Sequence, residues 1–244
     1  MSVAWRLLLS GAGEAGFNMA MDEAVALAVR RGWSPPTVRI YQWQAPAISL
    51  GCHQPASVLE QFGEDRARGI PVVQRPTGGG AVHHDRDVSY ALACRSEMLG
   101  GRPGRLLYEQ FHAALVATLG QTQSRAAYTL SDRPARAHPQ DSVCFQRPIQ
   151  HDVMRATDKV AGAAQRRWRD GLLQQGTVFE PALSRDRLAL CIRTAWAAVF
   201  RCRLTVGSLT VQERLLTDEL WSKYRPWTPS SWPPGSPSAS NPSR

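Results

Sequence analysis

Residues 75–85 read RPTGGGAVHHD and place three consecutive glycines between two short apolar segments. The flanking residues 69–74 and 87–93 are rich in valine, isoleucine and alternating small apolar residues, which predicts a strand on each side. The three glycines then form a turn inside a sheet, where glycine permits positive φ and lets other groups approach the backbone closely. A tight hairpin with a flexible tip would use the same glycines. No Gly-Lys-Ser/Thr follows, so the turn is not a phosphate loop of the usual kind.

The composition is that of a soluble globular protein. The 244 residues are 43% hydrophobic and 20% charged, with a net charge of +9 and only two lysines among 29 basic residues. This length suits one large domain, and no apolar run approaches the roughly 20 residues of a membrane helix. The positive charge favours an acidic partner. Because no helix-turn-helix, zinc finger or basic-aromatic platform is present, we expect neither nucleic acid nor a membrane as that partner.

The five cysteines form no Cys-x-x-Cys pair and have irregular spacing. An odd, irregular set argues against a disulfide framework and against a zinc site. We therefore expect a protein of the reducing cytoplasm that uses no metal.

Apolar periodicity predicts an α+β domain over residues 1–225, with a mixed central β-sheet, flanking helices and several strands joined through short hairpins. We expect a helix at 19–30 capped by Asn18. Further helices are expected at 56–68, 107–119, 184–200 and 210–224, and strands at 1–9, 37–43, 47–51, 69–74, 87–93, 159–167 and 171–179. Residues 142–145 and 149–154 are expected as short strand pieces, and 121–141 as a long loop with at most one short strand. The Pro/Ser-rich residues 226–244 have no periodicity and are expected to be a disordered tail.

Five segments, taken in order, resemble one family. They are NMAMDE at 18–23, RIYQW at 39–43 with SLGCHQ at 49–54, RPTGGGAVHH at 75–84, KVAGAAQRR at 159–167 and QGT at 175–177. The chain is thus similar to the lipoate–protein ligase and octanoyltransferase family, whose catalytic domain is related to that of biotin protein ligase. The resemblance covers roughly residues 3–224.

The resemblance implies a sheet that wraps a narrow tunnel for an octanoyl or lipoyl chain. The residues it assigns to substrate binding are Arg75, Thr77, Gly78, Gly79, Gly80, His84, Gly162, Ala163 and Gly176. His83 falls at a variable position, and the family lysine falls on Lys159. Independently of any family, a lysine carries a compact point charge on a thin stem that arginine cannot copy in a narrow site. The residues before this lysine, Thr157 and Asp158, depart from the glycine and basic residue common in the family.

The family's branches differ in chemistry. Its ligases activate a free acid with ATP and usually carry an accessory domain, whereas its transferases take the acyl group from a thioester onto a cysteine. The segment Ser142–Phe145, fifteen residues before Lys159, resembles the cysteine loop of one octanoyltransferase branch, with Cys144 as the nucleophile. After Tyr224 only the Pro/Ser-rich stretch remains, so we expect no accessory domain.

A thiolate attacks a thioester well and leaves well, which suits acyl relay from a carrier thiol to a lysine amine. A nearby ammonium such as that of Lys159 would favour the thiolate form of Cys144. Free cysteines are otherwise usually small buried hydrophobes, and we expect that role for Cys52, Cys94, Cys191 and Cys202.

We therefore predict an acyltransferase that moves octanoyl from octanoyl-acyl carrier protein to a lysine of a lipoyl domain or glycine-cleavage H protein, through a Cys144 thioester and without a cofactor. Its acidic carrier protein would suit the +9 charge. Three alternatives stay open: a lipoate ligase using ATP and Mg²⁺ without an accessory domain, a lipoyl or octanoyl amidotransferase, and a non-catalytic binder of lipoylated proteins. The sequence does not distinguish an octanoyl from a lipoyl chain.

Overall fold

A computed structural model describes residues 4–122, 127–134, 143–146 and 148–227. Its main feature is a mixed eight-stranded sheet, in the spatial order β11-β1-β2-β6-β10-β9-β8-β7. These strands are β11 (Leu204–Val206), β1 (Trp5–Gly13), β2 (Thr37–Trp43), β6 (Val88–Arg95), β10 (Gly171–Val178), β9 (Asp158–Arg167), β8 (Val153–Arg155) and β7 (Tyr128–Leu130). β1 pairs in parallel with both β2 and β11, and the remaining pairs are antiparallel. The predicted α+β class with a mixed sheet is confirmed.

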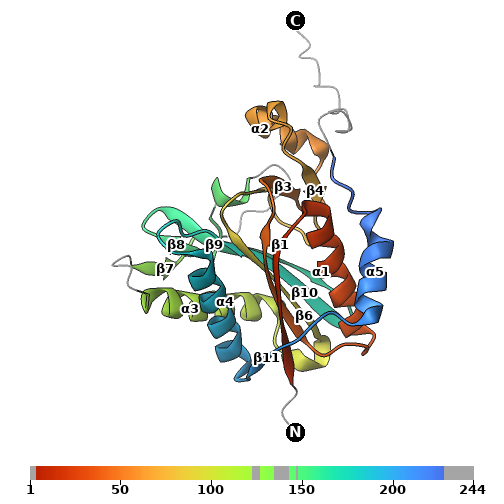
Figure 1. Ribbon diagram of the computed structural model, residues 1–244. Helices are drawn as coiled ribbons and strands as arrows, with labels where there is room; N and C mark the ends of the chain where they lie inside the picture. The colour runs from red at the N-terminus through yellow and green to blue at the C-terminus, as the bar shows by residue number, and fades with distance from the viewer. Residues whose placement is uncertain (1–3, 123–126, 135–142, 147, 228–244) are drawn as a thin grey trace, which may run out of the picture.

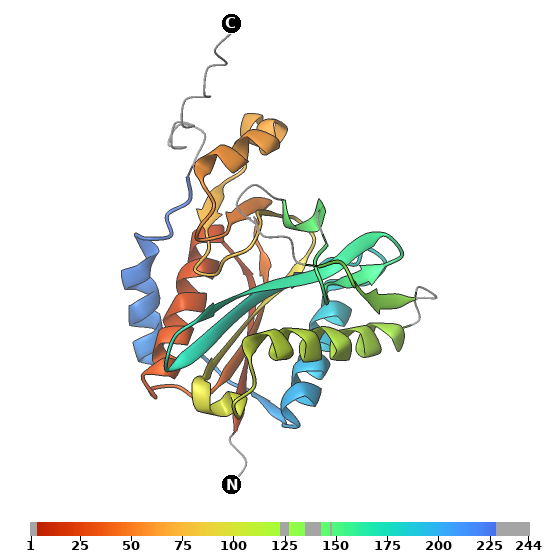
Figure 2. The ribbon, with the colours of Figure 1, turned by 180° about the vertical axis from the view of Figure 1, so that it is seen from behind.

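Helices cover both faces of this sheet (Figures 1 and 2). The long helices are α1 (Ala15–Arg30), α3 (Gly104–Gly120), α4 (Arg185–Phe200) and α5 (Val211–Trp221). α1 packs against β2, β6 and β10 and carries α5 on its outer side, whereas α3 and α4 pack together on the opposite face.

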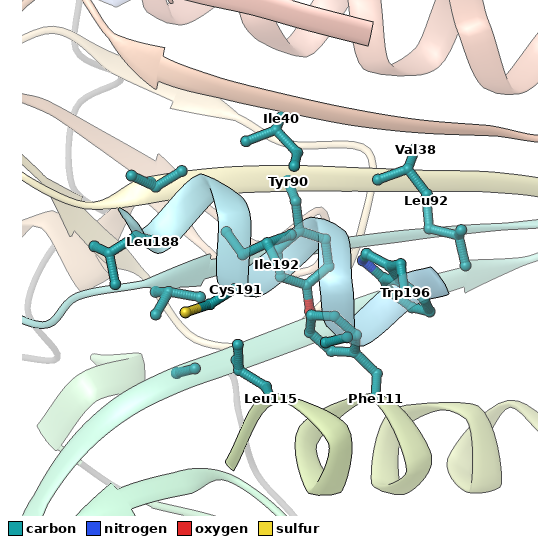
Figure 3. Close-up of a cluster of buried hydrophobic side chains, with 14 of the residues drawn as sticks. Val38, Ile40, Tyr90, Leu92, Phe111, Leu115, Leu188, Cys191, Ile192 and Trp196 are labelled. Atoms are coloured by element: carbon teal, nitrogen blue, oxygen red, sulfur yellow. The ribbon is translucent and has the colours of Figure 1, made fainter. Parts of the chain in front are cut away.

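Period-two alternation in the central strands explains why each face has its own core. In β2, Val38 and Ile40 belong to the cluster on the α3 and α4 side, while Tyr41 belongs to the cluster under α1. Successive strand residues point to opposite faces, and the face of β2 under α1 also carries the buried Arg39, whose charge is paired with Asp22 at 2.6 Å. Figure 3 shows the first cluster, in which Phe111 of α3 stacks on Trp196 of α4 with ring centroids 4.0 Å apart.

A second, three-stranded sheet lies at one end of the molecule, in the order β4 (Val72–Gln74), β3 (Ala47–Leu50), β5 (Val82–His84). Its small core packs against the 3₁₀ helix η1 (Ala56–Phe62), which is followed by the short helix α2 (Gly63–Ala67). The possibility of a tight hairpin at the triple glycine is wrong. The glycine turn crosses over β3, because β4 pairs with β3 in parallel and β5 pairs with β3 on its other edge.

The first helix begins earlier than predicted. α1 starts at Ala15 with Glu14 as its N-cap residue, so Asn18 lies inside the helix and is fully buried. The Asn18 amide donates to the backbone carbonyls of Gly13 and Gln42, each at 3.1 Å. The predicted cap is therefore wrong, because tertiary partners recruit the side chain that local sequence assigns to the helix end.

Other boundaries follow the sequence more closely. Ser184 caps α4, and Thr210 forms a capping box with Glu213 at the start of α5. Residues 56–68 form η1 and α2 instead of one helix, Cys144–Gln146 form a 3₁₀ turn (η4) instead of a strand, and the short strand β11 was not predicted. Most of the predicted tail lies outside the described residues, but Trp227 pairs with Val72 through two backbone hydrogen bonds of 2.8 and 3.1 Å.

Candidate active site

Arg75 organises the glycine turn from inside. It follows β4, is buried, and donates from its guanidinium to the backbone carbonyls of Ser49, Gly78 and Gly80 at 3.0, 2.5 and 2.8 Å. A guanidinium offers five fixed donors and suits a curved row of carbonyls. Gly79 adopts φ +85°, a left-handed conformation that an L side chain rarely takes. The turn is thus a rigid feature held by one buried cation.

An apolar pocket lies between this turn and strands β9 and β10. Its volume, including its mouth, is about 470 Å³. The residues lining it are Met19, Tyr41, Trp43, Ser49, Arg75, Gly79, Val82, His84, Ser89, Cys144, Phe145, Gly162, Ala163, Ala164, Gln175, Gly176 and Thr177. Although several of these residues are polar, the exposed surface of the pocket is mostly apolar, which suits an aliphatic chain.

The structure brings most of the predicted binding residues to this pocket. Three of them, Thr77, Gly78 and Gly80, are not among the lining residues. The buried Thr77 hydroxyl instead donates to Gln175 Oε1 at 2.8 Å, and Gly80 serves as an acceptor for Arg75. These positions hold the shape of the turn behind the pocket wall.

His84 sits in a hydrogen-bonded chain that sequence reasoning missed. Its Nε2 lies 2.8 Å from Ser49 Oγ, and its Nδ1 lies 2.9 Å from Asp87 Oδ2. The ring also stacks on Trp43 with centroids 3.9 Å apart. Burial alone raises the pKa of Asp87, but the contact with His84 and the hydroxyls of Ser89 and Thr177 outweigh it and lower that pKa. Of this set the sequence analysis assigned a role only to His84, because Ser49 lies in a family segment without an assigned role and Asp87 lies outside those segments.

Cys144 and Lys159 meet at the pocket. Cys144 lies in the turn η4, which is tied to the glycine turn by its backbone N–H donating to Ala81 O at 2.7 Å. Lys159 extends from β9 and donates from Nζ to Cys144 Sγ at 3.2 Å and to Cys144 O at 3.1 Å. The lysine is 7% exposed and also pairs with Asp152 at 2.7 Å.

These contacts set the charge of Lys159. Burial by itself lowers the pKa of its ammonium, but the opposite charges available at Cys144 and Asp152 outweigh burial and raise that pKa. A fixed positive charge beside a sulfur favours the thiolate over the thiol. The arrangement can therefore supply a nucleophilic sulfur next to an apolar chain site.

Gly162 makes room for this lysine. A Cβ at Gly162 would stand 2.6 Å from Lys159 Cε and 2.7 Å from its Nζ, closer than any real contact. At the neighbouring Gly176, a Cβ would stand 2.4 Å from the hydroxyl of Tyr90. In the β9–β10 pair Gly162 lies opposite Thr177 and Gly176 lies opposite Ala163, so the two glycines are diagonal neighbours, and their missing side chains let the two strands line the pocket closely.

The other cysteines lie in different surroundings. Burial raises the pKa of Cys94 to about 12 and raises the pKa of Cys191 and Cys202 as well. Cys52 follows the small sheet, and its N–H donates to Thr77 O at 2.9 Å. Among the five, Cys144 is the one beside the ammonium of Lys159.

A second, wider groove adjoins the pocket. It encloses about 1250 Å³, counting its open side, and its wall includes Phe145, Lys159 and Thr177, of which Phe145 and Thr177 also line the pocket. Arg86, Arg133 and Arg155 lie along it together with Asp158. Two spaces therefore meet near Lys159, one apolar and one with charged walls.

Over the described part of the chain, no cluster of three or more His, Cys, Asp or Glu side chains has the arrangement to hold a metal ion. No helix in the same residues is long and apolar enough to cross a membrane.

The sequence profile of the lipoyl protein ligase A/B catalytic domain matches residues 14–187. The chain belongs to this family. Two similar proteins are the octanoyltransferases LipM of Kyrpidia tusciae and of Symbiobacterium thermophilum. The first is 35% identical over 90% of this chain and 96% of the relative, and the second is 39% identical over 73% of this chain and 66% of the relative.

Solved structures show the same fold. A lipoate-protein ligase A bound with ATP superposes with a TM-score of 0.72 at 20% identity, covering 91% of this chain and 95% of that one. A Thermoplasma acidophilum protein with bound lipoic acid gives a TM-score of 0.74, also at 20% identity, over 90% and 95% of the two chains. At this identity the likeness concerns the fold, and the family resemblance read from the five sequence segments is confirmed.

Proposed function

We propose that this protein is an acyltransferase that moves an octanoyl group from octanoyl-acyl carrier protein to a lysine of a lipoyl domain or glycine-cleavage H protein, in the synthesis of protein-bound lipoate. The proposal takes its acyl group from the octanoyltransferases to which the chain is similar. Cys144 carries the acyl group between the two substrates as a thioester.

One observation carries the proposal. The Sγ of Cys144 lies 3.2 Å from the Nζ of Lys159 at the wall of an apolar pocket formed by the glycine turn and two strands. A transferase that works through a thioester needs a stabilised thiolate beside a chain site, and this geometry offers both.

The reaction divides into two balanced steps. In the first, the Cys144 thiolate attacks the carbonyl carbon of the donor thioester, and the carrier thiolate leaves and takes a proton from solvent. In the second, the acceptor amine attacks the new thioester, loses a proton as the amide forms, and releases Cys144 as the leaving group. Once the sulfur is acylated, one N–H of Lys159 is free to turn to the carbonyl oxygen, where negative charge develops.

The two adjoining spaces bind different parts of the substrates. The apolar pocket takes the octanoyl chain, and the groove that shares Phe145 and Thr177 with it takes first the donor arm and then the acceptor lysine. The net charge of +9 suits an acidic carrier protein. With five free cysteines, we place the enzyme in the cytoplasm.

The test is to mix the purified protein with octanoyl-acyl carrier protein in the absence of ATP and to follow its intact mass. We expect one added octanoyl group that hydroxylamine removes, that is absent in Cys144→Ala, and that moves to added H protein. Protein that gains no adduct but octanoylates H protein from free octanoate and ATP is a ligase. Transfer from a lipoylated or octanoylated protein in preference to the carrier protein identifies an amidotransferase, and binding without any transfer identifies a non-catalytic binder.

A further inference from the structure

Asp152 lies beside the candidate catalytic pair in a position that no sequence motif singled out. Its side chain is fully buried in the segment that leads into β8, with Oδ2 2.7 Å from Lys159 Nζ. A buried carboxylate is costly unless charges and donors surround it. Its place next to a buried lysine therefore needs an explanation.

Two further donors fix the carboxylate from other sides. The backbone N–H of Ile149 donates to Oδ2 at 2.7 Å, and the hydroxyl of Tyr108 in α3 donates to Oδ1. Tyr108 is itself held near β9, because its oxygen accepts from the N–H of Ala163 at 3.4 Å. Asp152 is thus a fixed point that joins helix α3, the loop before β8 and strand β9.

The geometry around Nζ fits the protonated form of Lys159. Three acceptors surround the nitrogen: Asp152 Oδ2 at 2.7 Å, Cys144 O at 3.1 Å and Cys144 Sγ at 3.2 Å. A lysine ammonium has three N–H donors and a neutral amine has two, so only the ammonium satisfies all three acceptors. The carboxylate makes the shortest of the three contacts.

We propose that Asp152 is a positioning residue that keeps Lys159 protonated and holds its Nζ against Cys144 Sγ during octanoyl transfer. The proposal rests on the function proposed above and adds a residue to it. Lys159 then acts through its charge, as a group that stabilises the thiolate and later the developing oxyanion, and does not act as a base. Without the carboxylate, Lys159 loses one of the two opposite charges that offset burial, and its nitrogen loses its shortest contact.

The groups that face Lys159 are Cys144 from η4, Asp152 from the loop before β8 and, through Asp152, Tyr108 from α3. His112 of α3 lies close enough to Asp152 and Lys159 for their charges to act on its imidazole, and its Nδ1 donates to the backbone carbonyl of His151 at 2.7 Å. His112 is buried, and burial lowers its pKa to about 4, so it stays neutral through the working range. Cys144 and Asp152 are thus the groups whose charges act directly on Lys159.

The experiment compares wild type with Asp152→Asn, which keeps the shape and removes the charge. Single-turnover acylation of Cys144 by octanoyl-pantetheine is measured from pH 6 to 11, and the two lysines of the chain are labelled competitively with acetic anhydride over the same range. Lys223, which is 49% exposed, serves as the internal reference. We expect the rate of Cys144 acylation to fall about 100-fold, because the Nζ of Lys159 moves from its position beside the sulfur. The KM for the donor should stay within about threefold, since the pocket is unchanged.

Two signatures separate positioning from a merely structural role. In Asp152→Asn the alkaline limb of the acylation profile, where the rate falls at high pH, should move to lower pH. Lys159 should also become reactive toward acetic anhydride at lower pH than in wild type. The matched control is Tyr108→Phe, which removes one hydrogen bond from the same carboxylate but keeps its charge. That variant should lose about tenfold or less and keep its alkaline limb, because Lys159 retains its partner.

If Asp152→Asn does not fold, the same labelling is carried out on Cys144→Ala, where Asp152 alone must keep Lys159 protonated. Lys159 that stays unreactive beyond pH 10 supports the proposal, and Lys159 that reacts below pH 9 overturns it. Two results in a folded Asp152→Asn also overturn the proposal. The first is an acylation rate and an alkaline limb that both match those of wild type. The second is a slower acylation rate with the same reactivity of Lys159 toward acetic anhydride as in wild type. A wild type that forms no octanoyl adduct refutes the proposed function instead, and the labelling of Lys159 still decides the role of Asp152.

Discussion

The Nζ of Lys159 lies 3.2 Å from the Sγ of Cys144, although the two residues come from different elements fifteen positions apart. Strand β9 holds the lysine, and a backbone hydrogen bond from Cys144 to Ala81 holds the cysteine turn against the glycine turn. The pair is therefore placed by two separate parts of the fold. Changes in either part of the fold should alter the chemistry of the Cys144–Lys159 pair.

Lys159→Arg should inactivate the enzyme although it keeps the charge. Three acceptors lie within 3.2 Å of a single nitrogen, and a planar guanidinium on a wider fork cannot meet all three from the same strand position. We expect octanoyl transfer to H protein to fall at least about 100-fold with folding intact. Lys223→Arg, the only other lysine replacement the chain allows, should retain wild-type transfer. Near-normal turnover of Lys159→Arg would mean that any positive charge suffices.

Cys144 should be the one cysteine whose loss abolishes transfer. In Cys144→Ser a hydroxyl replaces the thiol and stays protonated near neutral pH, so we expect a loss of several orders of magnitude with chain binding retained. Alanine at Cys52, Cys94, Cys191 or Cys202 should cost about 1–3 kcal/mol of stability at most. The measurement is transfer to H protein by each single variant. A dead Cys52→Ala beside an active Cys144→Ser would identify Cys52 as the nucleophile.

Gly162→Ala should disturb the lysine without unfolding the protein. The new Cβ would stand 2.6 Å from Lys159 Cε and 3.2 Å from Asp152 Oδ1, so the flexible lysine end must move away from the sulfur. We expect Cys144 acylation to fall about 100-fold, with a small change in melting temperature. The matched control is Gly120→Ala at the end of α3, where a Cβ meets nothing within 4 Å. Equal activity of the two variants would show that the new Cβ does not displace Lys159 from the sulfur.

His112 should make the protein less stable as the pH falls. Its Nδ1 donates to His151 O at 2.7 Å, and burial lowers its pKa from 6.5 to about 4. A histidine with a lowered folded pKa contributes stability above its unfolded pKa and loses it as pH drops from about 6.5 to about 4. The loss amounts to about 3 kcal/mol at most.

The measurement for His112 is the free energy of unfolding in urea at pH 7, 6, 5 and 4. His112→Asn keeps a donor near the Nδ1 position and removes the titration. It should be less stable at pH 7, because it leaves a cavity, but it should lose less stability on acidification than wild type. Parallel pH dependence of the two proteins would show that His112 is not the group that titrates.

Part of the fold follows directly from local pattern. Alternation over residues 37–43 predicts a strand, and the structure confirms it as β2, whose side chains divide between two cores. Ser184 and Thr210 predict helix starts because a hydroxyl can satisfy the free N–H groups of the first turn. Asn18 carries the same local signal, yet burial against β2 assigns it to the interior of α1.

The sequence by itself determined the family and the class of fold, and it predicted Cys144 and Lys159 as the catalytic residues. It did so because motif spacing and residue type are local properties. Only the tertiary structure decided that the glycine turn passes over β3, that Ser49 and Asp87 flank His84, and that Asp152 pairs with Lys159. A buried polar group must find its partner wherever the packed elements bring one, and no periodicity along the chain records which partner that is.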